Sequence, residues 1–214
     1  MIAKHLSKLV ELASGSLSPA VVQFEPFCGR FGNGELEMEL YGLLRQRNGF
    51  FAYHKGLHVF PFGKTLLGYD LLQWNSDELW RQEYGSIPAN VVFFAQDAFG
   101  EQFTIVENTV CRFQSETGEL AFMTNSLEEW AEKILDDPTY ETGYPVLRDW
   151  ESSNRPILVK ERLSSVQPFV MGGEYAVSNL FALDAVELLK YRVLIARSIK
   201  DIPDGQTIIF EAAD

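Results

Sequence analysis

Two apolar runs joined by a short polar turn, within residues 90–106, restrict the fold of this chain more than any other segment. Residues 91–95 are a continuous run of strand-forming types, and a second run resumes at residues 102–106. Asp97 and Gly100 lie between the runs and suit a reversal of the chain, Gly100 because it can adopt a positive φ. The pattern predicts an antiparallel hairpin at the centre of a sheet.

The same alternation of apolar runs and short turns extends the predicted sheet on both sides. Residues 50–62 change to aromatic and β-branched types around a glycine-containing turn, which indicates another hairpin. Further strands are expected at residues 109–114 and 118–123. We therefore predict consecutive, neighbouring antiparallel strands from residue 91 to residue 123.

Helical periodicity flanks these strands. Apolar residues at helical spacing predict helices at residues 2–14, 35–47, 76–85, 126–135 and 184–197. The helix at 126–135 is the best specified, because Ser126 and Glu129 have capping-box spacing and Pro138 follows its end. The glycine-dense residues 26–34 are predicted to be a loop, and residues 206–210 a last strand.

The order of these elements indicates the fold class. Helices precede a run of consecutive strands, and more helix and one closing strand follow, which is not a regular alternation of β and α units. We expect an α+β fold, with an antiparallel or mixed sheet of about six strands and helices packed on one side. No repeat, low-complexity tract or flexible linker divides the chain, so residues 1–214 are predicted to form a single domain.

Charge and hydropathy restrict the partners. The 214 residues include 18 Lys and Arg against 30 Asp and Glu, for a formal net charge of −12. Such a surface repels phosphate backbones, so direct binding to nucleic acid is not expected. The acidity is explained equally well by solubility alone and by a basic protein partner. No apolar run reaches the length of a bilayer span and the N-terminal segment does not have the pattern of a secretory signal, so we expect a cytoplasmic protein without membrane contact.

Few residues suggest chemistry. His54 and His58 could approach each other across a hairpin turn, but spacing fixes no third ligand, so surface histidines are the better interpretation. Asp97 and Glu101 are close in sequence, but carboxylates at a β-turn usually serve the turn geometry. The glycines of residues 29–34 lack a phosphate-binding motif, and no serine or cysteine has the surroundings of a nucleophile. We therefore expect no catalytic residues, no metal and no other cofactor.

Cysteines and tryptophans are expected to serve packing for the most part. Cys28 and Cys111 lack paired spacing, which predicts two reduced, buried thiols rather than a disulfide framework. Two tryptophans at helical spacing, Trp80 and Trp130, are expected in the core. Trp74 and Trp150 lie near the ends of predicted elements, where a partly exposed indole can anchor a protein interface. We treat these last two as candidate partner-binding residues.

Acidic residues supply the other candidates for partner binding. Between residues 126 and 151 there are eight acids against two bases. The apolar stripe of the helix at 126–135 is expected to turn inward and to leave an outward stripe of Glu128, Glu132 and Asp136. A basic partner would convert the repulsion within that stripe into attraction. The turn from Asp97 to Glu101 is the second choice for a contact surface.

The order and spacing of these motifs resemble the SUKH superfamily, the Smi/Knr-like proteins. The resemblance spans roughly residues 36–135 and rests on Asn48-Gly49-Phe50-Phe51, Leu57-His58-Val59-Phe60-Pro61, the helix from Trp74-Asn75 to Tyr84-Gly85, the stretch from Phe94 to Phe103, and the capped helix from Ser126. It implies helices packed on a several-stranded sheet, with a core at about 36–135 and a C-terminal extension at about 140–214. Many members are bacterial immunity proteins that bind and neutralise toxins, and others are regulatory hubs.

We therefore expect a non-enzymatic binding protein. The first interpretation is an immunity protein that neutralises a basic toxin domain, from a polymorphic or type VI secretion effector, by direct binding. A regulatory or scaffold protein of the same fold, and an enzyme of unrecognised chemistry, are the alternatives. A toxin gene beside this one would favour the first interpretation, and an isolated chromosomal context the second.

Overall fold

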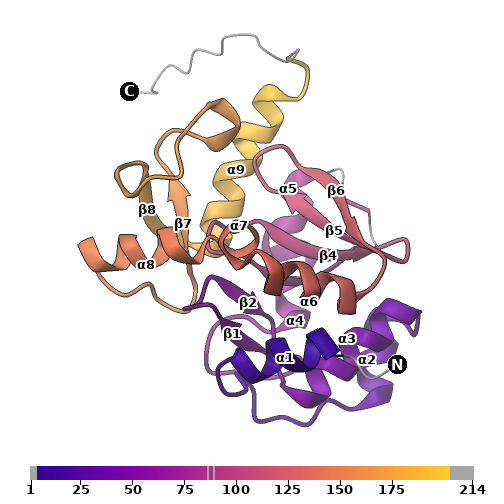
Figure 1. Cartoon of the computed structure of the whole chain (residues 1–214). Helices are drawn as coiled ribbons and strands as arrows, with labels where there is room; N and C mark the ends of the chain where they lie inside the picture. Colours follow the sequence, from indigo (N-terminus) through magenta and orange to yellow (C-terminus); the bar gives the residue numbers. More distant parts are fainter. Residues whose placement is uncertain (1–3, 86, 89, 203–214) are drawn as a thin grey trace.

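A six-stranded antiparallel sheet forms the centre of the fold (Figure 1), and the computed structural model describes residues 4–85, 87–88 and 90–202. Its strands are β1 (Phe50–Ala52), β2 (Leu57–Val59), β3 (Val92–Gln96), β4 (Gln102–Val106), β5 (Thr109–Gln114) and β6 (Glu119–Thr124). Each strand pairs with the next one along the chain. The predicted run of consecutive antiparallel strands is confirmed, while the strand predicted at 206–210 lies outside the described residues.

Helices precede, interrupt and follow the sheet, which confirms the α+β class. Before the sheet come α1 (Lys4–Leu12), α2 (Phe24–Phe31) and α3 (Glu35–Gln46). Between β2 and β3 lie α4 (Leu71–Trp74), the single π-helical turn η1 (Asp77–Arg81) and α5 (Gln82–Tyr84). After β6 follow α6 (Leu127–Asp136), α7 (Pro138–Thr142), α8 (Tyr144–Ser153) and α9 (Ala185–Ile199).

Helix α2 corrects the loop predicted at residues 26–34. The helix runs to Phe31 and ends at Gly32, whose φ of 92° suits a glycine. Pro26 lies in the first turn, where the missing amide hydrogen costs nothing. Phe27 is fully buried against neighbouring rings, so tertiary packing overrides the weak helix propensity of this glycine-rich segment.

Helices cover both faces of the six-stranded sheet. Phe93 packs against Trp80 of η1, with ring centroids 4.8 Å apart, whereas Phe94 packs against Trp130 of α6 at 5.1 Å. In Figure 1, α6 crosses the front of the sheet and α5 lies behind it. The prediction of helices on one side is therefore wrong. A central strand that is apolar at successive positions, as β3 is, is typical of a strand buried on both faces.

A second, smaller lobe follows α6 and includes a two-stranded antiparallel sheet of β7 (Glu161–Ser165) and β8 (Leu180–Asp184). Two short 3₁₀ helices, η2 (Phe169–Met171) and η3 (Val177–Asn179), lie in the connection between these strands. The lobe has its own apolar cluster, formed by Ala98, Phe99, Leu147, Trp150, Ile157, Leu163 and Leu180. Residues 98 and 99 come from the β3–β4 turn, so this cluster is built on the end of the two central strands of the large sheet.

The β1–β2 turn also holds the second lobe in place. Three successive residues of this turn, Tyr53, His54 and Lys55, have positive φ. His54 Nε2 lies 2.6 Å from a carboxylate oxygen of Glu151 in α8, and Lys55 Nζ donates to the Ile157 carbonyl at 2.9 Å. The lobe is thereby tied to the far edge of the sheet as well as to its centre.

Cys28 and Cys111 are both free, Cys111 buried and Cys28 half-buried. No helix in the described part of the chain has both the length and the apolar character that crossing a bilayer requires.

Candidate functional site

The turn from Asp97 to Glu101 is buried, contrary to its suggested role as a contact surface. Asp97 is 2% exposed. Its Oδ1 accepts hydrogen bonds from the amides of Phe99 (2.8 Å) and Glu101 (3.0 Å), and Gly100 has a φ of 82°. The predicted turn chemistry is confirmed, but the carboxylates point into the protein, because the second lobe covers the turn.

Glu101 belongs to a network around Arg192 of α9. Arg192 Nη1 lies 3.0 Å from Glu101 Oε1 and donates to Ser115 Oγ at 2.6 Å. Arg192 Nε lies 3.7 Å from Glu116 Oε1. Burial raises the pKa of Glu101, although Arg192 and the Ser115 hydroxyl oppose that effect. The network attaches α9 to the β3–β4 and β5–β6 turns.

A second network joins Asp97 to α7 and β7. Arg112 Nη1 lies 3.8 Å from Asp97 Oδ2, and Arg112 Nη2 lies 2.5 Å from Glu141 Oε2. Burial raises the pKa of Asp97 to about 7, against the attraction of Arg112. Burial also lowers the pKa of Arg162 in β7 to about 10, against the attraction of Asp97.

These two networks have perturbed pKa values, as active sites often do, but so do structural ion pairs. Within these networks each carboxylate has a guanidinium partner: Asp97 and Glu141 share Arg112, and Glu101 and Glu116 share Arg192. The partners come from β5, α7, α9 and the turns of the large sheet. We therefore interpret the networks as the junction that positions α7, α9 and the second lobe.

Glu128 does not belong to an outward stripe, because its carboxylate caps α1. It accepts hydrogen bonds from the amides of His5 (2.7 Å) and Leu6 (3.1 Å). Partial burial opposes ionisation, but these amides outweigh it and hold the pKa of Glu128 below its usual value. Glu132 and Asp136 are exposed as predicted, with His5 Nε2 3.8 Å from Glu132.

Two more of the eight acids between residues 126 and 151 are committed to internal contacts. Glu141 pairs with Arg112, and Glu151 accepts from the Ile157 amide at 2.6 Å. The acids that stay exposed in this segment are Glu129, Glu132, Asp136, Asp137 and Asp149.

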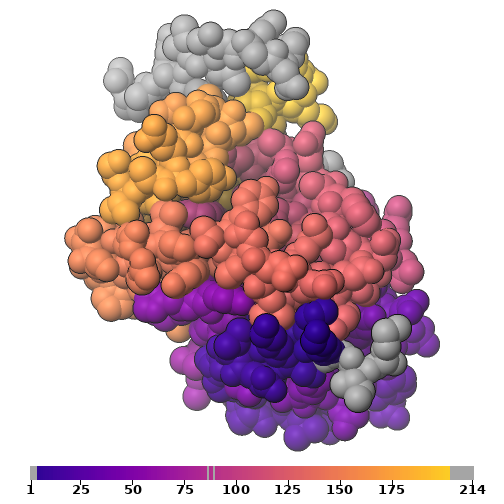
Figure 2. All heavy atoms as spheres, in the orientation of Figure 1, coloured from indigo at the N-terminus to yellow at the C-terminus, as the bar shows by residue number. Residues whose placement is uncertain are grey.

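Tyr140 lies beside the exposed acids and was not singled out in the sequence. Its side chain is 74% exposed. Asp137 Oδ1 accepts from the Tyr140 amide at 3.0 Å, and the Arg112 guanidinium lies 5.7 Å from the centre of the ring. We call Glu129, Glu132, Asp136, Asp137 and Tyr140 the α6–α7 acidic surface; α6 and α7 both lie on the face shown in Figure 2. In the sequence, the feature that could have identified Tyr140 as a surface residue is its position as an aromatic residue in a polar segment just after Pro138.

Trp74 and Trp150 are buried, so the expectation of partial exposure is wrong for both. Trp74 Nε1 donates to Gln102 Oε1 at 2.9 Å, and Trp150 Nε1 donates to the Leu180 carbonyl at 3.0 Å. An internal acceptor removes the cost of burying the indole N–H. Trp80 and Trp130 lie in the core, as predicted.

The histidines do not come together. His54 is exposed, as expected for a surface histidine, but His58 is buried, with Nδ1 3.2 Å from Gln96 Nε2. Burial, with the charge of Arg162 adding to it, lowers the pKa of His58 well below its usual value. In the part of the chain that the structure describes, no three His, Cys, Asp or Glu side chains are grouped as metal ligands.

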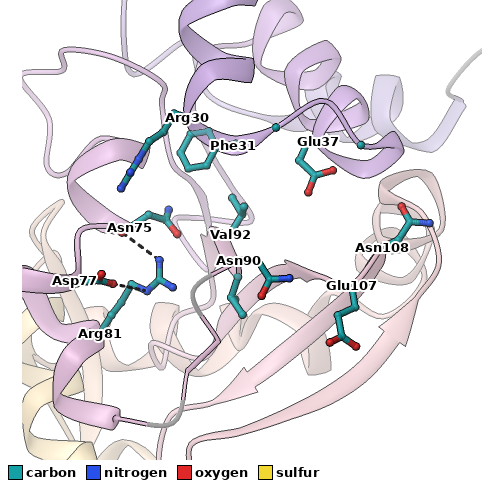
Figure 3. Close-up of a pocket in the computed structure, with 13 residues that line it drawn as sticks. Arg30, Phe31, Glu37, Asn75, Asp77, Arg81, Asn90, Val92, Glu107 and Asn108 are labelled. Atoms are coloured by element: carbon teal, nitrogen blue, oxygen red, sulfur yellow. Dashed lines mark hydrogen bonds and ion pairs between the residues drawn. The ribbon is translucent and has the colours of Figure 1, made fainter.

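A cavity of about 600 Å³ opens between α2, the start of α3, η1 and the β4–β5 turn (Figure 3). Arg30 and Arg81 lie on one side of it, and Glu37 and Glu107 on the other. The glycine-dense segment at residues 29–34 forms part of its wall. None of the partner-binding residues predicted from the sequence lines this cavity.

Comparison with known proteins supports the fold and adds no activity. No family model matches the sequence, and no curated protein is similar to it. One similar solved structure is that of Atu4351 from Agrobacterium tumefaciens, with a TM-score of 0.61, 12% sequence identity and coverage of 86% of both chains. At this identity the likeness shows a shared fold alone.

Proposed function

We propose that this protein is a non-enzymatic, cytoplasmic protein-binding domain that recognises a basic partner through the α6–α7 acidic surface. With the resemblance to the SUKH superfamily, the partner is a bacterial toxin domain and the function is immunity by direct binding. The α+β fold, a sheet with helices packed on it, is the kind of fold that this resemblance implies.

The observation that carries the proposal is an exposed aromatic ring, Tyr140, on the same surface as Glu132 and Asp136, two carboxylates without a strong internal partner among the described residues. The other acids of this segment are used inside the protein, Glu128 as a helix cap and Glu141 beside Arg112. Asp136 makes no such contact with a described residue, and Glu132 has only His5 at 3.8 Å. An aromatic anchor contributes to affinity when it is desolvated, and surrounding charges steer a complementary partner.

The test is a titration of this protein against the purified toxin domain encoded beside its gene, with rescue of growth on co-expression as the second readout. We expect Glu132→Lys with Asp136→Lys to lower the association rate about tenfold at low salt and to reduce its salt dependence. Tyr140→Ala should raise the dissociation rate, because the ring is lost but the charges stay.

The matched control is Glu25→Lys with Glu119→Lys, which changes the net charge equally at exposed acids of α2 and β6. If this control slows association as much as the α6 variant does, net charge rather than the α6–α7 acidic surface controls binding. If the wild type neither binds the toxin domain nor rescues growth, the immunity function is wrong.

A further inference from the structure

The cavity in Figure 3 has charges of opposite sign on its two sides. Arg30 is exposed and has no hydrogen bond or ion pair with any described residue. Glu37 and Glu107, across the cavity, likewise have no cationic partner in the described ranges. Asn108 lies near Glu107, in the same β4–β5 turn. Because Arg30 pairs with neither glutamate, each side keeps its charge.

Arg81 is held rigidly on the cationic side. Its side chain is 6% exposed, Nη1 donates to the Asn75 carbonyl at 3.1 Å, and Nη2 donates to the Pro88 carbonyl at 3.2 Å. The guanidinium carbon lies 5.3 Å from the centre of the Phe93 ring. Nε has no hydrogen-bond partner among the described residues, since the carboxylate of Asp77 stays 3.7 Å away.

The two guanidinium groups are close enough to repel each other. Burial lowers the pKa of Arg81, Asp77 opposes this effect, and the charge of Arg30 adds to it. Asp77 is a weak counterion, because its side chain is largely exposed to solvent. One side of the cavity therefore has an unfilled buried N–H donor and an excess positive charge, both of which a carboxylate would satisfy.

We propose that this cavity binds a zwitterionic ligand, with its carboxylate between Arg30 and Arg81 and its ammonium or guanidinium group at Glu37 and Glu107. A free basic amino acid and the C-terminal basic residue of a peptide share this chemistry. The volume of about 600 Å³ lies within the range of small-molecule sites. The cavity shares no residue with the α6–α7 acidic surface, so this proposal is tested independently of the proposed immunity function.

The experiment is calorimetric titration of the full chain with L-arginine, with the tripeptide Gly-Gly-Arg, and with the same tripeptide amidated at its C-terminus. We expect the free acid to bind about tenfold more tightly than the amide, since amidation removes the charged acceptor. Binding of L-arginine as well as the tripeptide identifies a free amino acid as a ligand, and binding of the tripeptide alone identifies a peptide terminus. Absence of saturable binding by either overturns the proposal, as does equal affinity for acid and amide.

Two variants separate the two sides of the cavity. Arg30→Gln should weaken the free-acid tripeptide about tenfold and leave the amide unaffected, whereas Glu107→Gln should weaken both. Both side chains are exposed and have no hydrogen bond or ion pair with a described residue, so the fold should be retained, which circular dichroism checks. Arg148→Gln in α8 is the matched control for loss of an exposed arginine outside the cavity. An equal loss in the control, or no loss in Arg30→Gln, contradicts the assignment.

Discussion

The core of the six-stranded sheet and the attachment of the second lobe are stabilised in different ways. In the sheet, Trp80, Phe93 and Phe113 pack ring against ring with centroids 4.8 to 6.2 Å apart. At the attachment, Arg112 and Arg192 connect buried carboxylates from separate elements. Apolar packing loses stability gradually as atoms are removed, whereas a buried ion pair that loses one member leaves an uncompensated charge. The attachment is therefore the region more sensitive to a single substitution.

The largest effect is expected for Arg192→Met, which retains apolar volume and removes the charge shared by Glu101 and Glu116. We expect the free energy of unfolding at pH 7 to fall by about 3–5 kcal/mol, as measured by urea denaturation. Arg197→Met is the control on the same helix, because Arg197 is more than half exposed and should cost almost nothing. Equal losses in the two variants would contradict the difference drawn between the two regions.

Next in size is Trp150→Ala, in the small cluster of the second lobe. Loss of the indole and of its hydrogen bond to Leu180 should cost about 3–4 kcal/mol. Amide hydrogen exchange should show the loss confined to residues 144–184, with protection of β3 and β4 unchanged. Uniform loss of protection would mean that the two regions unfold as one cooperative unit.

The ionisation of Asp97 makes the stability of the attachment depend on pH. Burial raises its pKa from 3.8 to about 7, so the folded protein favours the protonated carboxyl. Its contribution to stability is full below pH 4 and is lost as the pH rises to about 7. Relative to Asp97→Asn, the wild type should therefore become less stable by about 3–4 kcal/mol between pH 4 and pH 8. A difference between the two proteins that stays constant with pH would show that Asp97 ionises normally.

The smallest effect is expected at the cap of α1. Glu128→Gln keeps the hydrogen-bonding oxygen but loses the charge at the helix N-terminus, and should cost about 0.5–1 kcal/mol of unfolding free energy. Glu132→Gln, one turn further along α6 and more exposed, is the matched control with almost no cost. If both changes lower the unfolding free energy equally, the effect comes from the loss of one negative charge and not from the capping of α1.

The sequence predicts the large sheet well and its attachments poorly. Strands β3 to β6 are predicted from local sequence patterns, because their apolar runs and turn residues lie within a few positions of one another. The short strand β7 has the polar residues Arg162 and Ser164 at buried positions. It therefore lacks the apolar pattern by which a strand is recognised in a sequence. Residues 140–180 therefore lacked a signal that the second lobe exists.

The candidate site shows the same limit. The roles of Glu128 and Trp150 depend on partners in other elements, the α1 amides and the Leu180 carbonyl. Glu132 and Asp136 were found because their exposure follows from the periodicity of one helix. The cavity was missed because its cations, Arg30 and Arg81, are 51 positions apart in the chain and only the fold brings them to one wall.

The order of strand pairing has a consequence for the rate of folding. Every pairing in the six-stranded sheet joins consecutive strands, which requires only short-range loop closure for β3 to β6. The contact of Arg192 with Glu101 spans 91 positions, so it requires α9 to return to the β3–β4 turn. If this contact is absent from the transition state, Arg192→Met should accelerate unfolding and leave refolding almost unchanged in stopped-flow measurements. The lifetime of the native state would then depend on one late-forming helix rather than on the large aromatic core.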